Sequence, residues 1–319
     1  MTKPFASSAD LEAKRESLEV IAEGVYALTA EGDPNVGAIE AEDFVVCFEA
    51  RATPTAARNW LRMLRQFTDK PVRYLVLTHY HAVRVLGASA FEGAVVVASR
   101  ATHRLIAERG LQDWASEYGR MPRLFADPDS IPSLTWPDIA FDNRLDIDLG
   151  PRRGRLELHF CGRGHTAGDI VGWYPEAKTL FAGDLVESQA ALYTGDAFHT
   201  DWMTGTLDRL KEFPTEHLVG GRGTVVHGPA ACNAAIEQTR DFLQVTLREV
   251  REVHRQRGTI QHAFHAVQRA LGPRYGHWPI FEHCLPFNVQ RVWDELDGID
   301  WPRIWTADRD REVWASLQS

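Results

Sequence analysis

The chain lacks the features that mark a membrane-spanning, secreted or nucleic-acid-binding protein. None of its apolar runs approaches the ~20 residues that a membrane-spanning helix requires. The first 17 residues have no apolar core of the signal-peptide type. The 35 Lys and Arg residues are outnumbered by 44 Asp and Glu, for a net charge of −9, whereas a broad contact with phosphates needs clustered basic residues. We therefore expect a cytoplasmic protein that acts on a small molecule and binds neither membranes nor nucleic acid.

Cysteine is also scarce among the 319 residues. The chain has four cysteines, far apart and without a CxxC pair. This spacing predicts reduced, mostly buried thiols. They are Cys47, Cys161, Cys232 and Cys284.

The apolar patterning predicts strands and helices in alternation. Strands are expected between 18 and 49, interrupted by a turn at 32–34, and then at 72–77, 94–99, 145–150, 155–161, 169–175, 179–183 and 217–221. Helices are expected from Thr53-Pro54, after Gly87, and at 100–118, 202–213, 229–257, 260–271 and 288–296. Strands precede a helix in both halves, which favours two similar layers that face each other. We expect a catalytic domain at 18–230 and a helical extension at 231–319.

The segment 72–87, VRYLVLTHYHAVRVLG, is the most informative stretch. Its apolar strand ends in Thr78-His79-Tyr80-His81. Two histidines two apart on an extended backbone point to the same side. They can therefore place two imidazole nitrogens on one metal ion, at ~2.0–2.1 Å each.

Three later strands each run into a glycine-rich turn that carries a polar residue. These turns lie at 162–169, 183–184 and 220–223. Glycine lets the backbone turn sharply and approach a ligand closely. Polar residues gathered at the ends of neighbouring strands are a common way to build a binding site.

Together, THYH at 78–81, GHTAGD at 164–169 and FAGD at 181–184 are similar to motifs of the metallo-β-lactamase superfamily. Their order and spacing fit most of residues 20–230. The resemblance implies an α/β fold, an αββα sandwich of the metallo-β-lactamase type, here with a C-terminal helical extension. It also implies a three-histidine metal site, with a carboxylate that either binds the same metal or bridges it to a second one. The residues so implied are His79, His81, His165 and Asp184.

The chain departs from the family pattern at the second metal. The family's first motif is HxHxDH, whereas this chain places Val83 at the Asp and Arg84 at the last His. The family's final His ligand corresponds to Arg222 or, in another register, to His227. We favour Arg222 because an apolar strand ends immediately before it.

These departures predict a single metal ion. A second divalent cation would be repelled by two guanidinium groups. Arg84 and Arg222 could take over part of its electrostatic role, either by pairing with Asp184 or by binding a substrate carboxylate in a bidentate way.

Four further residues are candidates for supporting roles. Glu49 either orients a ligand histidine or is a solvated carboxylate. Asp169 is expected to cap a turn or support a ligand rather than bind the metal. His283 either reaches the metal site or packs between a helix and the core, and His227 remains the alternative to Arg222.

We therefore expect a mononuclear metal-dependent hydrolase with zinc as the preferred ion and iron or manganese as alternatives. A metal-bound hydroxide would attack a small ester, lactone, amide or activated aromatic substrate, with an acidic group favoured by the arginines. Asp184 would orient the water or accept its proton. The alternatives are a mononuclear iron oxidoreductase, similar to the persulfide dioxygenases of this superfamily, and a catalytically silent binding protein. The long C-terminal helix has apolar positions on more than one side, which is compatible with a homodimer.

Overall fold

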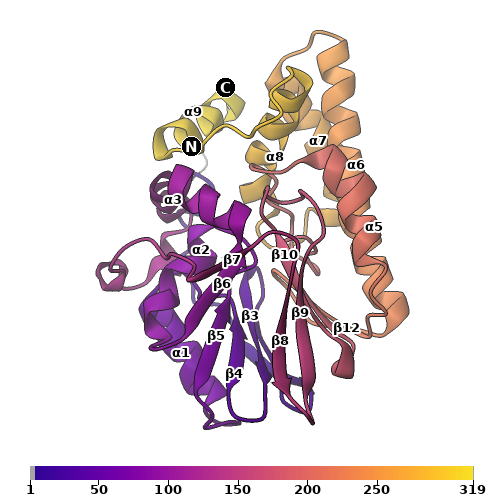
Figure 1. Ribbon diagram of the computed structural model, residues 1–319. Coiled ribbons are helices and arrows are strands. Elements are labelled where there is room, and N and C mark those ends of the chain that lie inside the picture. The colour runs from indigo at the N-terminus through magenta and orange to yellow at the C-terminus, as the bar shows by residue number, and fades with distance from the viewer. Residues whose placement is uncertain (1–3, 319) are drawn as a thin grey trace.

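The computed structural model describes residues 4–318 and has two β-sheets packed face to face between helices (Figure 1). The αββα sandwich expected from the sequence is confirmed. Helices α7, α8 and α9 lie at the top of the view, above the strands.

The first sheet has seven strands among the described residues, in the order β1 to β7. The first four strands pair antiparallel, and β4 to β7 run parallel. The strands are β1 (Ser17–Ala22), β2 (Val25–Ala30), β3 (Asp33–Glu40), β4 (Val45–Phe48), β5 (Val72–Val76), β6 (Val95–Ser99) and β7 (Ile139–Phe141).

The second sheet has six strands in the order β13-β12-β11-β10-β9-β8. Its pairs are antiparallel except β11 and β12, which are parallel. The strands are β8 (Arg144–Gly150), β9 (Gly154–Phe160), β10 (Ile170–Tyr174), β11 (Thr179–Gly183), β12 (His217–Gly220) and β13 (Val226–His227).

The helices cover the outer faces of both sheets and one edge of the sandwich (Figure 1). They are α1 (Pro54–Leu64), α2 (Ala82–Val85), α3 (Arg100–Arg120), α4 (His199–Asp201), α5 (Leu207–Leu210), α6 (Pro229–Arg255), α7 (Ile260–Tyr275), α8 (Phe281–Leu296) and α9 (Ala307–Gln318). Short helical turns also lie at 86–90 (η1), 122–125 (η2), 128–130 (η3) and 175–177 (η4), and a π-helical turn lies at 202–206 (η5).

Helix α1 forms where the sequence predicts it. The Thr53 side chain accepts a hydrogen bond from the Ala56 N–H at 3.1 Å, and Pro54 occupies the first turn, where its missing N–H costs nothing. Trp60 and Leu64 are then buried on one face, against the first sheet.

The helix expected after Gly87 begins five residues earlier, at Ala82. Two carboxylates of α3 replace a local cap: Asp113 accepts from the Ala82 N–H and Glu117 from the Val83 N–H, each at 2.7 Å. The first N–H groups of a helix need such acceptors. Because these acceptors lie about 30 residues away in the chain, the local sequence did not reveal this start.

Four other boundaries differ from expectation. Glu31, at a φ of 51°, makes a tight turn with Gly32, so β3 already starts at Asp33. The helical piece expected at 202–213 is divided between η5 and α5. Helix α8 begins at Phe281 instead of 288, because Phe281, Cys284 and Leu285 are buried at helical spacing. Helix α9 was not predicted.

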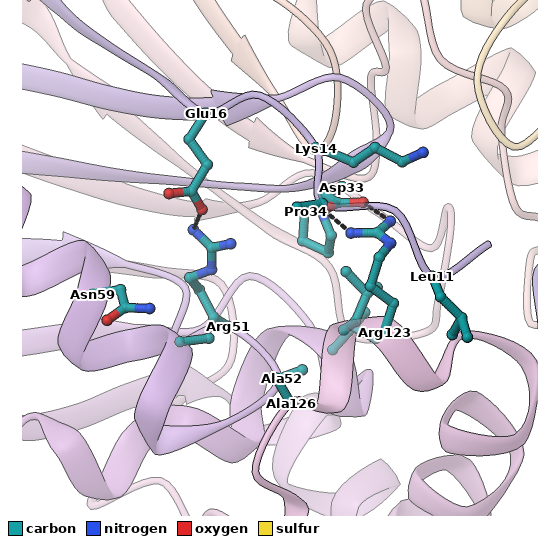
Figure 2. Close-up of a pocket in the computed structure, with 14 residues that line it drawn as sticks. Leu11, Lys14, Glu16, Asp33, Pro34, Arg51, Ala52, Asn59, Arg123 and Ala126 are labelled. Carbon is teal, nitrogen blue, oxygen red and sulfur yellow. Dashed lines mark hydrogen bonds and ion pairs between the residues drawn. The ribbon is translucent and has the colours of Figure 1, made fainter.

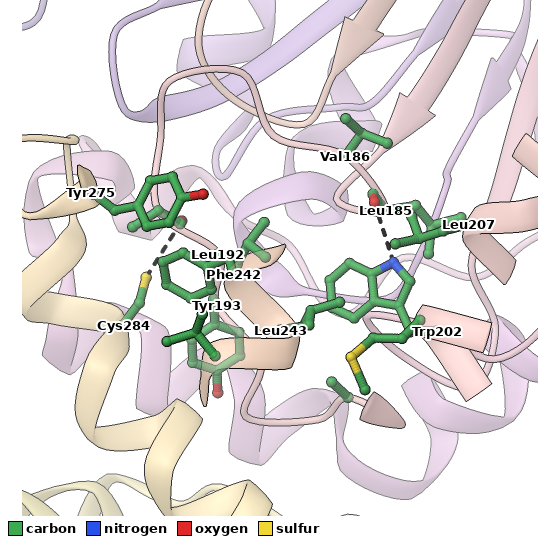
Figure 3. Close-up of a cluster of buried hydrophobic side chains, with 14 of the residues drawn as sticks. Leu185, Val186, Leu192, Tyr193, Trp202, Leu207, Phe242, Leu243, Tyr275 and Cys284 are labelled. Carbon is green, nitrogen blue, oxygen red and sulfur yellow. Dashed lines mark hydrogen bonds between the residues drawn. The ribbon is translucent and has the colours of Figure 1, made fainter. Parts of the chain in front are cut away.

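The expected boundary between 230 and 231 falls inside α6. Helices α6 to α8 share one hydrophobic core with the outer face of the second sheet and with the loop that follows β11. Figure 3 shows Leu185 and Tyr193 of that loop beside Phe242 and Leu243 of α6. The helical extension therefore completes the sandwich and does not form a core of its own.

The four cysteines are buried and free, as expected. No helix within residues 4–318 is both long and apolar enough to cross a membrane.

The contact between the two sheets depends on glycines opposite aromatic rings. Phe48 of β4 stacks on Phe181 of β11 with ring centroids 4.2 Å apart. A Cβ at Gly172 of β10 would lie 2.4 Å from the Phe48 ring, and one at Gly37 would lie 2.3 Å from the Phe181 ring.

We predict that Gly172→Ala lowers the free energy of unfolding by about 1–3 kcal/mol, because the rings cannot move without disturbing the stacked pair. Urea denaturation of the two proteins measures the difference. Gly119→Ala, in α3 with no described atom within 4 Å of the added Cβ, is the control and should be neutral or up to about 1 kcal/mol more stable. Equal stability of Gly172→Ala and the wild type would contradict the packing argument.

Candidate metal site

The metal site predicted from the motifs assembles at one edge of the sandwich. His79 and His81 follow β5 of the first sheet, whereas His165 precedes β10 and Asp184 follows β11 of the second. One ligand atom from each of these four side chains lies within 4.8 Å of the others. All four residues are at most 3% exposed.

Each histidine uses one ring nitrogen for a hydrogen bond away from the common centre. These bonds join His79 Nδ1 to Thr78 Oγ1 at 3.0 Å, His81 Nε2 to Asp196 Oδ2 at 3.2 Å, and His165 Nδ1 to the Tyr193 carbonyl at 2.9 Å. A carbonyl and a carboxylate can only accept, so His165 Nδ1 and His81 Nε2 carry protons. The Thr78 hydroxyl donates to Glu49 and therefore accepts from His79 Nδ1. The inward nitrogens are left as His79 Nε2, His81 Nδ1 and His165 Nε2.

The inward atoms suit a divalent cation. His79 Nε2 is buried and has no hydrogen-bond partner among the described residues, and it lies 3.7 Å from Asp184 Oδ2. His165 Nε2 lies 3.5 Å from the same oxygen. Burial lowers the pKa of His165 to about 3 and that of His79 well below its usual value, so both offer neutral nitrogens. Three imidazoles and one carboxylate form a donor set that suits zinc, iron or manganese.

Two of the inward nitrogens lie close to each other. His81 Nδ1 lies 3.0 Å from His165 Nε2, which is a hydrogen-bond distance. Burial opposes a charged His81, yet the carboxylates of Asp113 and Asp196 raise its pKa to about 9. The distance between the two nitrogens allows them to share one proton, and a bound cation would displace it.

Asp184 lies between two buried guanidinium groups. Arg84 Nη2 donates to Asp184 Oδ1 and, at 2.7 Å, to the Gly221 carbonyl, while its Nη1 donates to the Asn35 carbonyl at 3.0 Å. Arg222 Nη1 donates to Asp184 Oδ2 at 2.9 Å. Although burial opposes ionisation, Arg84 and Arg222 hold the pKa of Asp184 well below its usual value. Asp184 is therefore a stable anion and a weak base.

A second metal has no comparable donor set around Asp184. Val83 is buried, offers no ligand atom, and its N–H donates to Glu117 at 2.7 Å. Arg84 and Arg222 are at most 4% exposed and carry positive charge beside the carboxylate that two metals would share. Among residues 4–318, the four-residue group is the one group of three or more His, Cys, Asp or Glu side chains whose ligand atoms lie close enough together to hold an ion.

The structure places Arg222, not His227, beside Asp184. His227 lies at the edge of the second sheet with its side chain 46% exposed, and its Nε2 pairs with Glu19 at 2.7 Å. Its Nδ1 contacts His217 at 2.8 Å. The alternative register for the last ligand is therefore wrong.

Glu49 is buried, so the solvated alternative for this residue is wrong. It accepts hydrogen bonds from the Thr78 N–H at 3.3 Å and from the Thr78 hydroxyl. Burial raises the pKa of Glu49 to about 7. Glu49 thus acts on His79 through Thr78, in the orienting position expected from the sequence.

Asp169 and His283 lie outside the four-residue group. Asp169 caps the turn before β10 by accepting from the Thr166 N–H at 2.7 Å and the Thr166 hydroxyl at 2.8 Å, as expected. His283 does not reach the inward nitrogens. Helix α8 directs it toward α3, where its ring nitrogens lie 3.4 Å from Arg120 Nη1 and 3.0 Å from Ser7 Oγ.

Two acidic residues of the site were missed in the sequence. Asp196, the partner of His81, also accepts from Arg109 at 3.1 Å. Glu187 accepts from Arg222 at 3.1 Å, and burial, followed by the charge of Asp184, raises the pKa of Glu187 to about 8. Neither belongs to a motif, and Asp196 lies 115 residues from its histidine in the chain.

The C-terminal helices hold the loop that carries Asp196 and Tyr193. The Asn288 side chain of α8 accepts from the Thr194 N–H at 2.7 Å and donates to the Leu192 carbonyl at 2.8 Å. Arg291 and Trp305 donate to the carbonyls on either side of Asp196, at 2.7 and 2.9 Å. The partners of His81 and His165 therefore depend on C-terminal residues that lie outside the three motifs in the chain.

The fold and the site define a metal-binding αββα protein. A family model for the metallo-β-lactamase superfamily matches residues 30–222, and the chain belongs to that superfamily.

The curated relatives match only part of the chain. The metallo-β-lactamase type 2 of Bacillus sp. (strain 170) is 25% identical over 182 residues, which are 53% of this chain and 61% of that protein. The type 2 enzyme of Elizabethkingia meningoseptica is 28% identical over 108 residues, 33% of this chain and 41% of that protein. The chain thus spans less than two thirds of the length of these relatives.

Solved structures share the fold at low sequence identity. A metallo-β-lactamase from Pontibacter korlensis has a TM-score of 0.57 and 23% identity, covering 72% of this chain and 99% of that one. FIM-1 of Pseudomonas aeruginosa, solved in a mono-zinc form, has a TM-score of 0.55 and 20% identity over 72% of this chain and 95% of that one. A double mutant of the sec-alkyl sulfatase PisA1 has a TM-score of 0.70 and 16% identity, covering 88% of this chain and 50% of that one.

We predict that Asp196→Asn weakens zinc binding by about 10–100-fold, because the variant keeps the shape of the His81 partner but loses its charge. Competition with a chelator of known affinity measures the change. Asp201→Asn, whose side chain is 46% exposed and paired with Arg163, is the matched control. An Asp196→Asn affinity within twofold of the wild type would show that Asp196 does not position His81.

Proposed function

We propose that the protein is a mononuclear metal-dependent hydrolase that acts on a small anionic ester, lactone, amide or activated aromatic substrate. The observation that carries the proposal is the convergence of three inward imidazole nitrogens on Asp184, whose carboxylate also pairs with Arg84 and Arg222. Superfamily membership supports the hydrolase chemistry.

A zinc ion held by His79, His81, His165 and Asp184 would lower the pKa of a coordinated water toward ~7 and supply a nucleophile at neutral pH. The tautomers set by Thr78, Asp196 and the Tyr193 carbonyl keep the three nitrogens available as donors.

Asp184 and the two arginines have different tasks in this proposal. Both Asp184 oxygens accept from guanidinium groups. Asp184 would therefore hold the metal and orient the water, but it is too weak a base to accept the water proton effectively. Arg84 and Arg222 supply fixed positive charge where negative charge develops on the substrate.

The loop at 186–198 contacts two of the buried candidate ligands, through Asp196 on His81 and the Tyr193 carbonyl on His165. The turn at Gly32 is in contact with Pro279, and the Ala191 N–H donates to the Pro279 carbonyl at 3.1 Å. We propose that displacement of the 186–198 loop and the 278–280 segment admits the substrate, since the four inward side chains are at most 3% exposed.

The substrate class is tested with a panel of neutral and anionic esters, lactones and amides. Alkyl sulfates belong in the panel, because the similar structure that covers 88% of this chain is named a sec-alkyl sulfatase. Hydrolysis of anionic members in preference to neutral ones of equal size would support the role assigned to Arg84 and Arg222.

We predict that hydrolysis disappears on treatment with a chelator and returns on addition of zinc. His165→Ala should lower the rate by more than about 100-fold, because it removes a ligand and not merely the partner of one. His227→Ala, at the exposed edge of the second sheet, is the control and should retain full activity. Turnover that survives chelation would contradict the proposal, and bound iron with oxygen consumption would favour an oxidoreductase.

We also predict one metal ion per chain by mass spectrometric metal analysis of the zinc-saturated protein. The double variant Val83→Asp, Arg222→His restores two ligand types of the family pattern and removes one repelling charge, so it should bind a second ion. The single variant Arg222→Lys retains the charge and should bind one ion. Two ions at full occupancy in the wild type would contradict a mononuclear site.

A further inference from the structure

A groove with a volume of about 510 Å³ has none of the four candidate metal ligands in its lining and is not used by the proposed reaction. This volume lies within the range of small-molecule sites. Figure 2 shows that the groove is lined by the N-terminal strap, which we define as residues 4–16, and by the first sheet, α1 and the turn after α3. The strap contains no helix or strand.

The strap places carboxylates on the arginines of the groove. Glu16 Oε1 pairs with Arg51 Nη1 at 2.7 Å, and Asp10 Oδ2 lies 3.7 Å from Arg123 Nη2. In Figure 2 the Glu16 and Arg51 side chains point toward each other across the groove. The strap therefore provides a carboxylate near each of the two arginines, Arg51 and Arg123.

The two arginines differ in whether they have a carboxylate partner outside the strap. Arg123 is held by Asp33 in a bidentate pair at 2.6 and 2.7 Å. Arg51 has Glu16 as its carboxylate partner, with no partner for its guanidinium from outside the strap among the described residues. Without the strap, the groove would hold Arg51, Arg123 and Asp33, two positive charges against one negative. Arg51 would then be the cation left to bind an anion.

Arg51 is held in the groove by its backbone. Its φ is 63°, and its carbonyl accepts from the Gly87 N–H at 3.0 Å. Such a conformation is uncommon for a residue other than glycine and persists only where the surrounding structure imposes it. The Arg51 side chain is only 14% exposed, so it is positioned before any ligand arrives.

Most of the remaining lining is apolar, with two polar members, Asn59 of α1 and Lys14 of the strap, whose Nζ pairs with Asp10 at 3.0 Å. Leu11, Pro34, Ala52, Val83 and Leu124 contribute to the walls. An apolar body with one anionic group would therefore match both the walls and the cation.

We propose that this groove binds a small organic acid, whose carboxylate takes the place of Glu16 on Arg51 while its apolar body lies against the walls. Glu16 is then an internal competitor for the ligand. Binding requires no metal and does not depend on the proposed hydrolysis.

The experiment uses 2-naphthoate as the probe and calorimetry on the full-length chain. Glu16→Gln should bind the probe about 3- to 5-fold more tightly than the wild type, since the partly buried ion pair between Glu16 and Arg51 no longer has to be broken. Arg51→Gln should bind it at least about 10-fold more weakly, since a charge-assisted hydrogen bond is lost. Naphthalen-2-ylmethanol, a neutral analogue, should bind weakly and respond little to either change.

The matched controls are Glu12→Gln on the strap and Arg58→Gln on α1. Arg58 is exposed and contacts Thr55 outside the groove, so both controls should bind the probe as the wild type does. Thermal melts establish that each variant is folded. Three results would each overturn the proposal: Arg51→Gln binding as tightly as the wild type, no gain from Glu16→Gln, or no binding to either Glu16→Gln or the wild type.

Discussion

The rest of the site depends on the ion pairs that Asp184 makes with Arg84 and Arg222. Arg84 comes from the first sheet side of the sandwich, while Asp184 and Arg222 follow neighbouring strands of the second. The pairs therefore join the two sheets at the edge where the imidazoles converge. A buried carboxylate is costly unless it is paired and hydrogen-bonded, and here both oxygens are satisfied. The same arginines place two positive charges beside that carboxylate.

Around this centre, the direction of each histidine is set by a different part of the fold. Thr78 and Glu49 orient His79 from within the first sheet. Asp196 and the Tyr193 carbonyl lie in a loop between the sheets and the C-terminal helices. That loop is buried in the core shown in Figure 3 and is tied to α8 through its backbone. The helices that complete the sandwich thus also fix the tautomers of two proposed ligands.

The groove under the strap also contains arginine–carboxylate pairs, but they are less buried than those of Asp184. Arg51 lies two residues after Glu49, in a turn where both residues have positive φ. The turn therefore carries one side chain that supports His79 through Thr78 and another that faces the groove. Strain of this kind is found where function requires a fixed direction for a side chain.

The apolar pattern of the sequence predicted most of the strand ends. The resemblance of three short motifs to those of the metallo-β-lactamase superfamily implied the three histidines, Asp184 and the replacement of a second-metal acid by Val83. It also identified Arg84 and Glu49 as candidates, and left Arg222 and His227 as alternatives. Only the tertiary structure decided between those two, excluded His283 from the centre, and brought Asp196 and Glu187 into it. These residues meet their partners across loops and helices far apart in the chain. Such contacts leave no local periodicity, since they arise from packing between elements and not from the geometry of any one of them.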